Sequence, residues 1–290
     1  LQKQHNSCFA RMKRHLIIGV RKTHRYTPNH KTSDFIVPFT SSGCSAMCMY
    51  CYLVCNYNKC SYMRLFVNRE AMMDRLIKNS QKSDKELVFE IGSNSDLILE
   101  NTITNNLPYV IERFSTIERG YLTFPTKFDM VNPLLPLNHR GRIKIRMSVN
   151  PEEIIQKIEF KTSRLDARID AINKLCEAGY KVGLLIAPVV LTENWKQLYS
   201  GLIDKLSAQL SSCTKKQLFI EIIFMTYSYV HKAINNDAFP NAIELYDKQI
   251  MTGRGRGKYC YRESVRHEGE EFLRAEIAGK LPEAKVVYVV

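Results

Sequence analysis

Short apolar runs of strand length alternate with longer amphipathic runs along most of the chain. The short runs are almost continuously apolar, which is typical of parallel strands buried on both faces. They occupy residues 35–40, 86–92, 120–126, 142–150, 181–190 and 217–225, with further runs at 15–20 and 284–290. The amphipathic runs predict helices at residues 68–80, 106–117, 163–180 and 194–210.

The run at 163–180 illustrates the helical pattern. Leu165, Ile169 and Ile172 recur at helical spacing, and Gly179 supplies a stop signal at the end. Strands that alternate with helices in this way predict a parallel sheet of six strands from residue 35 onward. Periodicity does not decide whether this sheet is open or curls into a partial barrel. In both architectures we expect the chemistry at the carboxyl ends of the strands.

The stretch GCSAMCMYCYLVC follows the first strand of this set directly, so it is expected at that edge of the sheet. It contains Cys44, Cys48 and Cys51 in a C-x3-C-x2-C arrangement. Zinc sites usually need four ligands, commonly as two pairs, and no second pair of suitable spacing stands elsewhere. Three thiolates suit an iron–sulfur cube in which one iron keeps an open position.

The remaining cysteines carry weaker signals. The chain has 290 residues and nine cysteines, and this odd number in a long chain without a visible signal peptide indicates a reducing, cytosolic compartment. Cys55 and Cys60 offer too few ligands for a second metal. We expect the others to be small buried hydrophobes or inert surface thiols. These are Cys8, Cys176, Cys213 and Cys260.

Charge adds an expected partner. Lys and Arg number 42 against 29 Asp and Glu, a net charge of +13 that favours a polyanion such as nucleic acid. No run reaches the roughly 20 apolar residues of a membrane span, so no membrane partner is expected. Basic residues cluster around Arg11–Arg14 and Arg21–Arg25, and in two later runs at 139–146 and 253–259.

The two later runs are the candidates for nucleic-acid contact. Arg142, Lys144 and Arg146 alternate, so they share one face of a strand, which points either into a barrel or to solvent. In the last run, glycines alternate with cations before an aromatic residue, a pattern that suits phosphate contact and insertion into a distorted duplex. Its candidate contacts are Arg254, Arg256, Lys258 and Tyr259.

Segments spread over nearly the whole chain carry a family resemblance. The cysteine loop with its two tyrosines resembles the signature of the radical S-adenosylmethionine superfamily. The ordered segments around it resemble, more specifically, the spore photoproduct lyase family. These segments are IIGVRKT (17–23), GCSAMCMYCYL (43–53), FEIGSNSD (89–96), TKF (126–128), SVN (148–150), AGYKVGLLIAP (178–188) and GKYCY (257–261).

This resemblance implies an α/β fold, a partial (β/α)6 TIM-like barrel of the radical S-adenosylmethionine type. The barrel would span residues 35–226, after an N-terminal segment (1–34) and before a C-terminal extension (227–290) with a DNA-contacting β-hairpin. It implies a [4Fe-4S] cluster on Cys44, Cys48 and Cys51, with S-adenosylmethionine on the unique iron. An external one-electron reductant and ultraviolet-damaged DNA would be the partners, in the cytoplasm of a spore-forming bacterium (the spore core).

The implied activity is DNA repair. A 5′-deoxyadenosyl radical would take a hydrogen from C6 of the spore photoproduct, the methylene bridge would fragment, and a hydrogen would return to the thymine radical. The resemblance places S-adenosylmethionine against five residues at the strand ends, where a lysine suits a carboxylate and short polar side chains suit ribose hydroxyls. They are Ser95, Lys127, Ser148, Asn150 and Ala187. Taken alone, Ser95 also fits a helix cap and Lys127 a solvated surface charge.

Tyr50 and Tyr52 match a tyrosine pair that lines the radical path of the family, although two aromatics could equally pack the loop. Ser93 departs from the family, whose usual cysteine at this position returns the final hydrogen. A serine O–H bond is too strong for that step. Three explanations remain: Tyr52 or another residue donates, Cys55 or Cys60 has taken over, or the substrate differs.

Two alternatives to the lyase therefore stay open. One is a radical S-adenosylmethionine enzyme on the same scaffold that acts on another substrate. The other is a non-catalytic iron–sulfur protein that binds nucleic acid.

Overall fold

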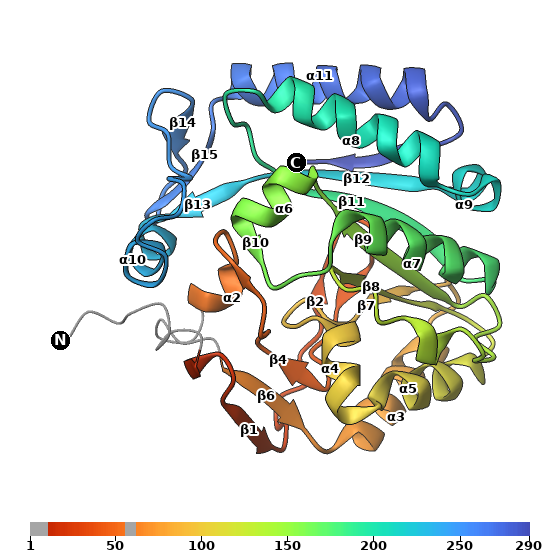
Figure 1. Ribbon diagram of the computed structural model, residues 1–290. Helices are drawn as coiled ribbons and strands as arrows, with labels where there is room; N and C mark the ends of the chain where they lie inside the picture. The colour runs from red at the N-terminus through yellow and green to blue at the C-terminus, as the bar shows by residue number, and fades with distance from the viewer. Residues whose placement is uncertain (1–10, 56–61) are drawn as a thin grey trace.

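An eight-stranded sheet curls into a half-barrel at the centre of the molecule (Figure 1). The computed structural model describes residues 11–55 and 62–290. The order of strands across the sheet is β16-β12-β11-β9-β8-β7-β3-β2, and all neighbours are parallel except β2 and β3. The strands are β2 (Thr27–Pro28), β3 (Phe35–Ile36), β7 (Val88–Glu90), β8 (Tyr121–Thr126), β9 (Ile143–Val149), β11 (Lys181–Val189), β12 (Phe219–Phe224) and β16 (Lys285–Val289).

The six strands expected from residue 35 onward are β3, β7, β8, β9, β11 and β12, so the predicted parallel sheet is confirmed, and the curled form is the one adopted. The run at 284–290 forms β16, which pairs with β12 and extends the same sheet. The predicted C-terminal extension thus contributes a strand to the barrel as well as a hairpin.

Helices cover the outer face of the half-barrel, and the longer ones bury an apolar stripe against it (Figure 1). In α7, for example, Leu165, Ile169 and Ile172 are at most 2% exposed. The four predicted helices are confirmed as α3, α5, α7 and α8, with ends that differ by a few residues. The helices are α3 (Arg69–Gln81), α4 (Leu97–Thr104), α5 (Asn106–Ser115), α6 (Glu152–Ile158), α7 (Leu165–Glu177), α8 (Trp195–Gln209), α9 (Ser212–Gln217) and α11 (Glu263–Lys280).

Three small sheets flank the half-barrel. The strand expected at 15–20 forms, but it belongs to one of these small sheets and not to the barrel. Their strands are β1 (Leu16–Gly19), β6 (Met63–Phe66) and β4 (Ser41–Ser42) in the first, β5 (Met47–Cys48) and β10 (Glu159–Phe160) in the second, and β13 (Thr226–Ser228), β15 (Lys258–Tyr261) and β14 (Met251–Gly253) in the third. The short helices α2 (Tyr52–Cys55) and α10 (Tyr229–Ala238) and the 3-10 turn η1 (Asn132–Leu134) complete the fold. None of the helices in the described part of the chain is long and apolar enough to cross a bilayer.

Ion pairs fill part of the barrel interior. Arg146 on β9 is 3% exposed and lies 2.9 Å from Glu90 on β7 and 3.2 Å from Glu221 on β12. The face that Arg142, Lys144 and Arg146 share therefore points into the barrel, while the apolar residues between them face the helices.

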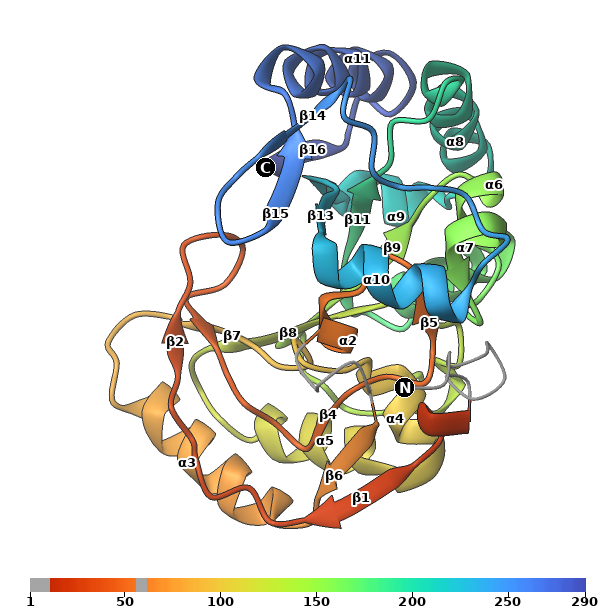
Figure 2. The same ribbon diagram turned by 90° about the vertical axis from the view of Figure 1, so that its left-hand side faces the viewer.

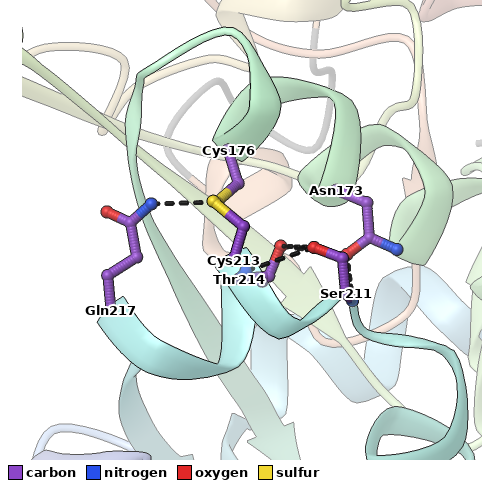
Figure 3. The surroundings of a disulfide bond; sticks show 6 residues. All are labelled: Asn173, Cys176, Ser211, Cys213, Thr214 and Gln217. Atoms are coloured by element: carbon purple, nitrogen blue, oxygen red, sulfur yellow. Dashed lines mark hydrogen bonds between the residues drawn. A yellow bond between two sulfur atoms is a disulfide. The ribbon is translucent and has the colours of Figure 1, made fainter.

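A disulfide between Cys176 and Cys213 joins α7 to α9 (Figure 3). The prediction that both are unpaired thiols is wrong, because the two helices pack side by side and bring residues 37 apart in sequence to a Cα separation of 6.6 Å. Asn173 strengthens this contact, accepting 2.9 Å hydrogen bonds from Ser211 N and Thr214 Oγ1. Cys260 is free and half-buried, as expected; Cys8 and Cys60 lie outside the described residues.

Candidate active site

A cavity of about 290 Å³ opens at the carboxyl ends of the barrel strands, beneath the cysteine loop. It gathers residues from segments more than a hundred positions apart, as expected from the sequence for that edge of the sheet. Its lining includes Cys44, Cys48, Cys51, Tyr50, Tyr52, Ser93, Ser95, Lys127, Ser148 and Ala187. Asn150, the other candidate for cofactor binding, lies behind this lining, fully buried.

Gly43 lets the cysteine loop leave the sheet at this point. Its φ of +89° is strained for any residue with a side chain, and a Cβ there would collide with the backbone carbonyl of Tyr62. The loop is pinned on both sides: Gly43 N donates to Asn94 O at 2.7 Å, and Cys48 pairs with Glu159 between β5 and β10. The cysteines are therefore held over the strand ends.

The three cysteines fit an iron–sulfur cluster. All three are free and line one cavity. Within residues 11–55 and 62–290, no three side chains of His, Cys, Asp or Glu lie close enough together to hold a single metal ion. An iron–sulfur cluster does not require this, because each thiolate binds a separate iron of the cluster. Burial raises the pKa of Cys44 to about 12 and raises that of Cys48 as well. Thiolates at these positions thus need a positive partner, which bound iron would supply.

Lys127 is the cation of the cavity. Its Nζ donates to Ser148 Oγ at 2.5 Å, to Ala187 O at 2.8 Å and to Glu159 Oε1 at 2.9 Å. Three of the five residues expected to bind S-adenosylmethionine thus meet at one ammonium group. This geometry excludes a solvated surface charge, the simpler interpretation of Lys127.

Glu159 organises the site, and sequence reasoning missed it. Its carboxylate accepts hydrogen bonds from the Tyr50 hydroxyl, from Asn150 Nδ2 at 2.8 Å and from Arg168 Nη2 at 2.8 Å. Burial opposes its ionisation, but the charges of Lys127 and Arg168 and these hydrogen bonds outweigh burial and lower the pKa to about 2. Glu159 is therefore a buried carboxylate that orients a phenol, an amide and an ammonium together.

The helix cap considered for Ser95 belongs to Asp96 instead. Asp96 Oδ1 accepts from Ile98 N at 3.1 Å and from Leu99 N at 3.2 Å, at the start of α4. Ser95 faces the cavity, and its Oγ accepts a 2.6 Å hydrogen bond from Ser41 Oγ. Its side chain is therefore available to a ligand there.

Ser93 and Tyr52 lie against each other at the cavity wall. The Tyr52 hydroxyl donates to the backbone carbonyl of Ser93, and Tyr52 is 52% exposed. The Ser93 hydroxyl donates to Glu90 Oε1 at 2.7 Å. The position at which the family resemblance leads us to expect a cysteine is thus in direct contact with a phenol.

The predicted hairpin is confirmed as β14 and β15 (Figure 2). Arg254, Arg256 and Lys258, at its turn, are exposed. Tyr259 packs against Tyr229 and Tyr246, with ring centroids 5.2 and 4.6 Å apart. A small aromatic cluster thus stands at the base of a cationic turn.

The other candidate contacts lie away from this turn. Arg146 is enclosed by its two ion pairs, and Lys144 lies over the ring of Phe219 at 4.8 Å. Arg142 precedes the amino end of β9, roughly 20 Å along the strand from Ser148 in the cavity. These positions lend no support to their prediction as nucleic-acid contacts, which stays untested.

Comparison with known proteins gives one consistent result. The family model described as "Spore photoproduct lyase" matches residues 2–290. The spore photoproduct lyase of Bacillus subtilis is 32% identical over 99% of this chain and 85% of its own length, and that of Geobacillus sp. is 31% identical over 94% and 81%.

Solved structures agree with this. A spore photoproduct lyase complexed with dinucleoside spore photoproduct matches with a TM-score of 0.91 and 28% identity, over 98% of this chain and 85% of the other. A variant of spore photoproduct lyase with bound AdoMet and the same dinucleoside matches equally well. The half-barrel, the cysteine loop at its mouth and these matches together show that the chain belongs to the spore photoproduct lyase family, which are radical S-adenosylmethionine lyases.

Proposed function

We propose that this chain repairs the spore photoproduct in DNA to two thymines, and that Tyr52 returns the final hydrogen in place of the usual cysteine. The contact between Tyr52 and Ser93 in the cavity carries the second part of this proposal. A solved relative holds a dinucleoside spore photoproduct, which supports the first part.

The donor set suits two cofactors. Cys44, Cys48 and Cys51 would hold a [4Fe-4S] cluster, and Lys127 would bind the carboxylate of S-adenosylmethionine, with Ser95, Ser148, Asn150 and Ala187 around it. When bound, this pair supplies the 5′-deoxyadenosyl radical that takes a hydrogen from C6 of the lesion. The chain's own part is to hold C6 of the lesion in place and to shield the thymine radical from solvent.

Hydrogen return is the step that the chain itself performs. After the methylene bridge breaks, a carbon radical remains on one thymine. The Tyr52 O–H bond can break homolytically, because the phenoxyl radical is delocalised over the ring, and the hydrogen atom forms the last C–H bond of the thymine methyl group. One electron from an external reductant and one proton then restore the phenol.

Ser93 is poorly suited to the same step. Its hydroxyl hydrogen is directed at Glu90, which is itself held 2.9 Å from Arg146. The alkoxyl radical that Ser93 would form also has no aromatic ring over which the unpaired electron could be delocalised. Ser93 would instead present its oxygen lone pairs to the cavity, as a hydrogen-bond acceptor.

DNA would approach along the hairpin. Arg254, Arg256 and Lys258 are exposed at its turn and suit phosphate groups, and Tyr259 lies just behind them. Extrusion of the lesion from the duplex resembles base flipping, which costs less at a damaged step. We place the protein in the cytoplasm, in the core of spores, because that is where its lesion would form.

The test is to reconstitute the protein with iron and sulfide without oxygen, and to add reductant, S-adenosylmethionine and dinucleoside spore photoproduct. Lesion-dependent release of thymine supports repair. Cofactor cleavage that is unaffected by the lesion would favour another substrate on the same scaffold. Iron and sulfide bound without any cleavage of S-adenosylmethionine would favour the non-catalytic iron–sulfur protein that binds nucleic acid.

A further inference from the structure

A second cavity lies on the opposite face of the sheet from the active site, between α3 and the segment that leads into β2. Its volume is about 450 Å³. Phe89 forms part of its wall, whereas the next residue, Glu90, lines the active-site cavity. Because successive strand residues point to opposite faces, the two cavities lie on different sides of β7. Figure 2 shows the segment between β1 and β2 running beside α3 at the edge of the molecule.

The rim of this second cavity is cationic. Arg25 comes from the segment before β2 and Arg75 from α3, and both are exposed. No carboxylate belongs to the described lining, and no described acidic residue forms a salt bridge with either arginine. The acidic residues of α3 are engaged elsewhere: Glu70 with Arg69 at 3.0 Å and Asp74 with Arg113 at 3.2 Å.

His24 lines the same cavity as these arginines. Its burial and the nearby charges of Arg75 and Arg21 lower its pKa below the usual value. Two guanidinium groups from separate elements face a common space. Guanidinium groups bind phosphate oxygens in a bidentate manner, so an anion with such oxygens is the ligand that the rim suits.

The floor of the second cavity is aromatic. Phe35 and Phe89 stack with centroids 6.0 Å apart, and Tyr26 meets the two rings at 6.4 and 6.2 Å. Asn79 of α3 lies in the same lining as Tyr26. Phe89 is fully buried beneath the other two rings, whereas the half-buried rings of Tyr26 and Phe35 offer a surface on which a planar base can stack while its phosphate meets the arginines.

We infer that this second cavity binds a nucleotide unit, with the phosphate on Arg25 and Arg75 and the base against Tyr26 and Phe35. The shared chemistry is that of a phosphate ester next to a nucleobase. It has two possible sources: a phosphodiester strand that runs past the protein outside the lesion site, or a free nucleotide. The volume is within the range of small-molecule sites.

The test uses the full chain with Arg25→Gln and Arg75→Gln, and Lys78→Gln as the matched control. Lys78 is an exposed cation of the same helix that is not part of the cavity lining. Two probes separate the sources: an undamaged single-stranded oligothymidylate, followed by fluorescence anisotropy, and thymidine 5′-monophosphate, followed by calorimetry. Neither probe depends on repair, so the result stands apart from the proposed lyase activity.

We expect each arginine variant to weaken binding of one probe roughly three- to tenfold, and the control to leave it nearly unchanged. If the oligonucleotide is the weakened probe, the slope of log affinity against log salt should also fall by about 0.7, the value for one phosphate contact on a single strand. If the arginine variants instead bind thymidine 5′-monophosphate more weakly, the ligand of the cavity is a free nucleotide. Equal effects of Arg75→Gln and Lys78→Gln on both probes would overturn the inference.

Discussion

The Ser93 hydroxyl donates a 2.7 Å hydrogen bond to Glu90, whose carboxylate forms a 2.9 Å ion pair with Arg146. This one contact engages the Ser93 hydrogen with a carboxylate of the cavity wall. It provides a geometric reason, besides bond strength, why the residue at the usual cysteine position should not return the hydrogen here.

Replacing Ser93 by cysteine should therefore restore direct hydrogen return, because a thiol S–H bond is weak enough to break in that step. In a Tyr52→Phe background, where the phenol can no longer donate, the expected result of adding Ser93→Cys is a larger share of clean thymine and less adduct between the thymine radical and the reductant, measured by chromatography of the products. Ser95→Cys is the matched control, since it places a thiol in the same cavity at a different position. A product ratio that stays the same when Ser93→Cys is added to Tyr52→Phe would contradict this account of position 93.

Cys51→Ala should abolish cluster binding. A [4Fe-4S] cluster on this loop would have a cysteine ligand on three of its four irons, and the two cysteines that remain cannot hold it. Iron and sulfide analysis of the reconstituted protein measures this. Cys260→Ala removes a free, half-buried thiol outside the active-site cavity and should leave the iron content unchanged. Retained S-adenosylmethionine cleavage in Cys51→Ala would show that the ligands are assigned wrongly.

Lys127→Met should weaken S-adenosylmethionine binding about 10- to 100-fold, as expected for the loss of a hydrogen bond to a charged group. Equilibrium binding of labelled cofactor to the reconstituted protein measures the dissociation constant. Lys157→Met, which breaks an exposed 2.7 Å ion pair with Glu153, is the control and should have no effect. A dissociation constant that stays the same in Lys127→Met would exclude this lysine as the carboxylate ligand.

Arg168→Met should reduce the free energy of unfolding by about 3–5 kcal/mol, because it leaves the buried carboxylate of Glu159 without one of its two cations. The two side chains are fully buried and 2.8 Å apart. The control is Arg164→Met, because the Arg164 side chain is 77% exposed in its ion pair with Glu152. This change should reduce the free energy of unfolding by at most about 1 kcal/mol. Denaturant unfolding compares the two variants, and similar losses would contradict the structural role of Arg168.

The strands were predictable because burial on both faces leaves a local trace, a continuous apolar run such as 181–190. The position of the cysteine loop was predictable for the same reason, since it follows one such run. The resemblance to a known family then identified Lys127 and Ser148 as members of the site.

Other features depend on partners far away in sequence. Glu159 lies in an ordinary stretch, and its importance arises from Lys127, 32 positions before it, and from Tyr50, 109 positions before it. The alternation on β9 revealed a shared face but not its direction, which was decided by Glu90 and Glu221 on other strands. The disulfide was missed because Cys176 and Cys213 meet only once α7 and α9 have packed.

The central claim, repair with hydrogen return by Tyr52, is tested most directly in D2O. The reconstituted enzyme and its Tyr52→Phe variant would be given reductant, S-adenosylmethionine and dinucleoside spore photoproduct, and every thymine product analysed by mass spectrometry. The account predicts clean thymine with one deuterium in its methyl group from the unchanged enzyme, and reductant adducts in its place from Tyr52→Phe. Deuterated thymine at an unchanged rate from Tyr52→Phe, or no lesion-dependent product from either protein, would contradict it.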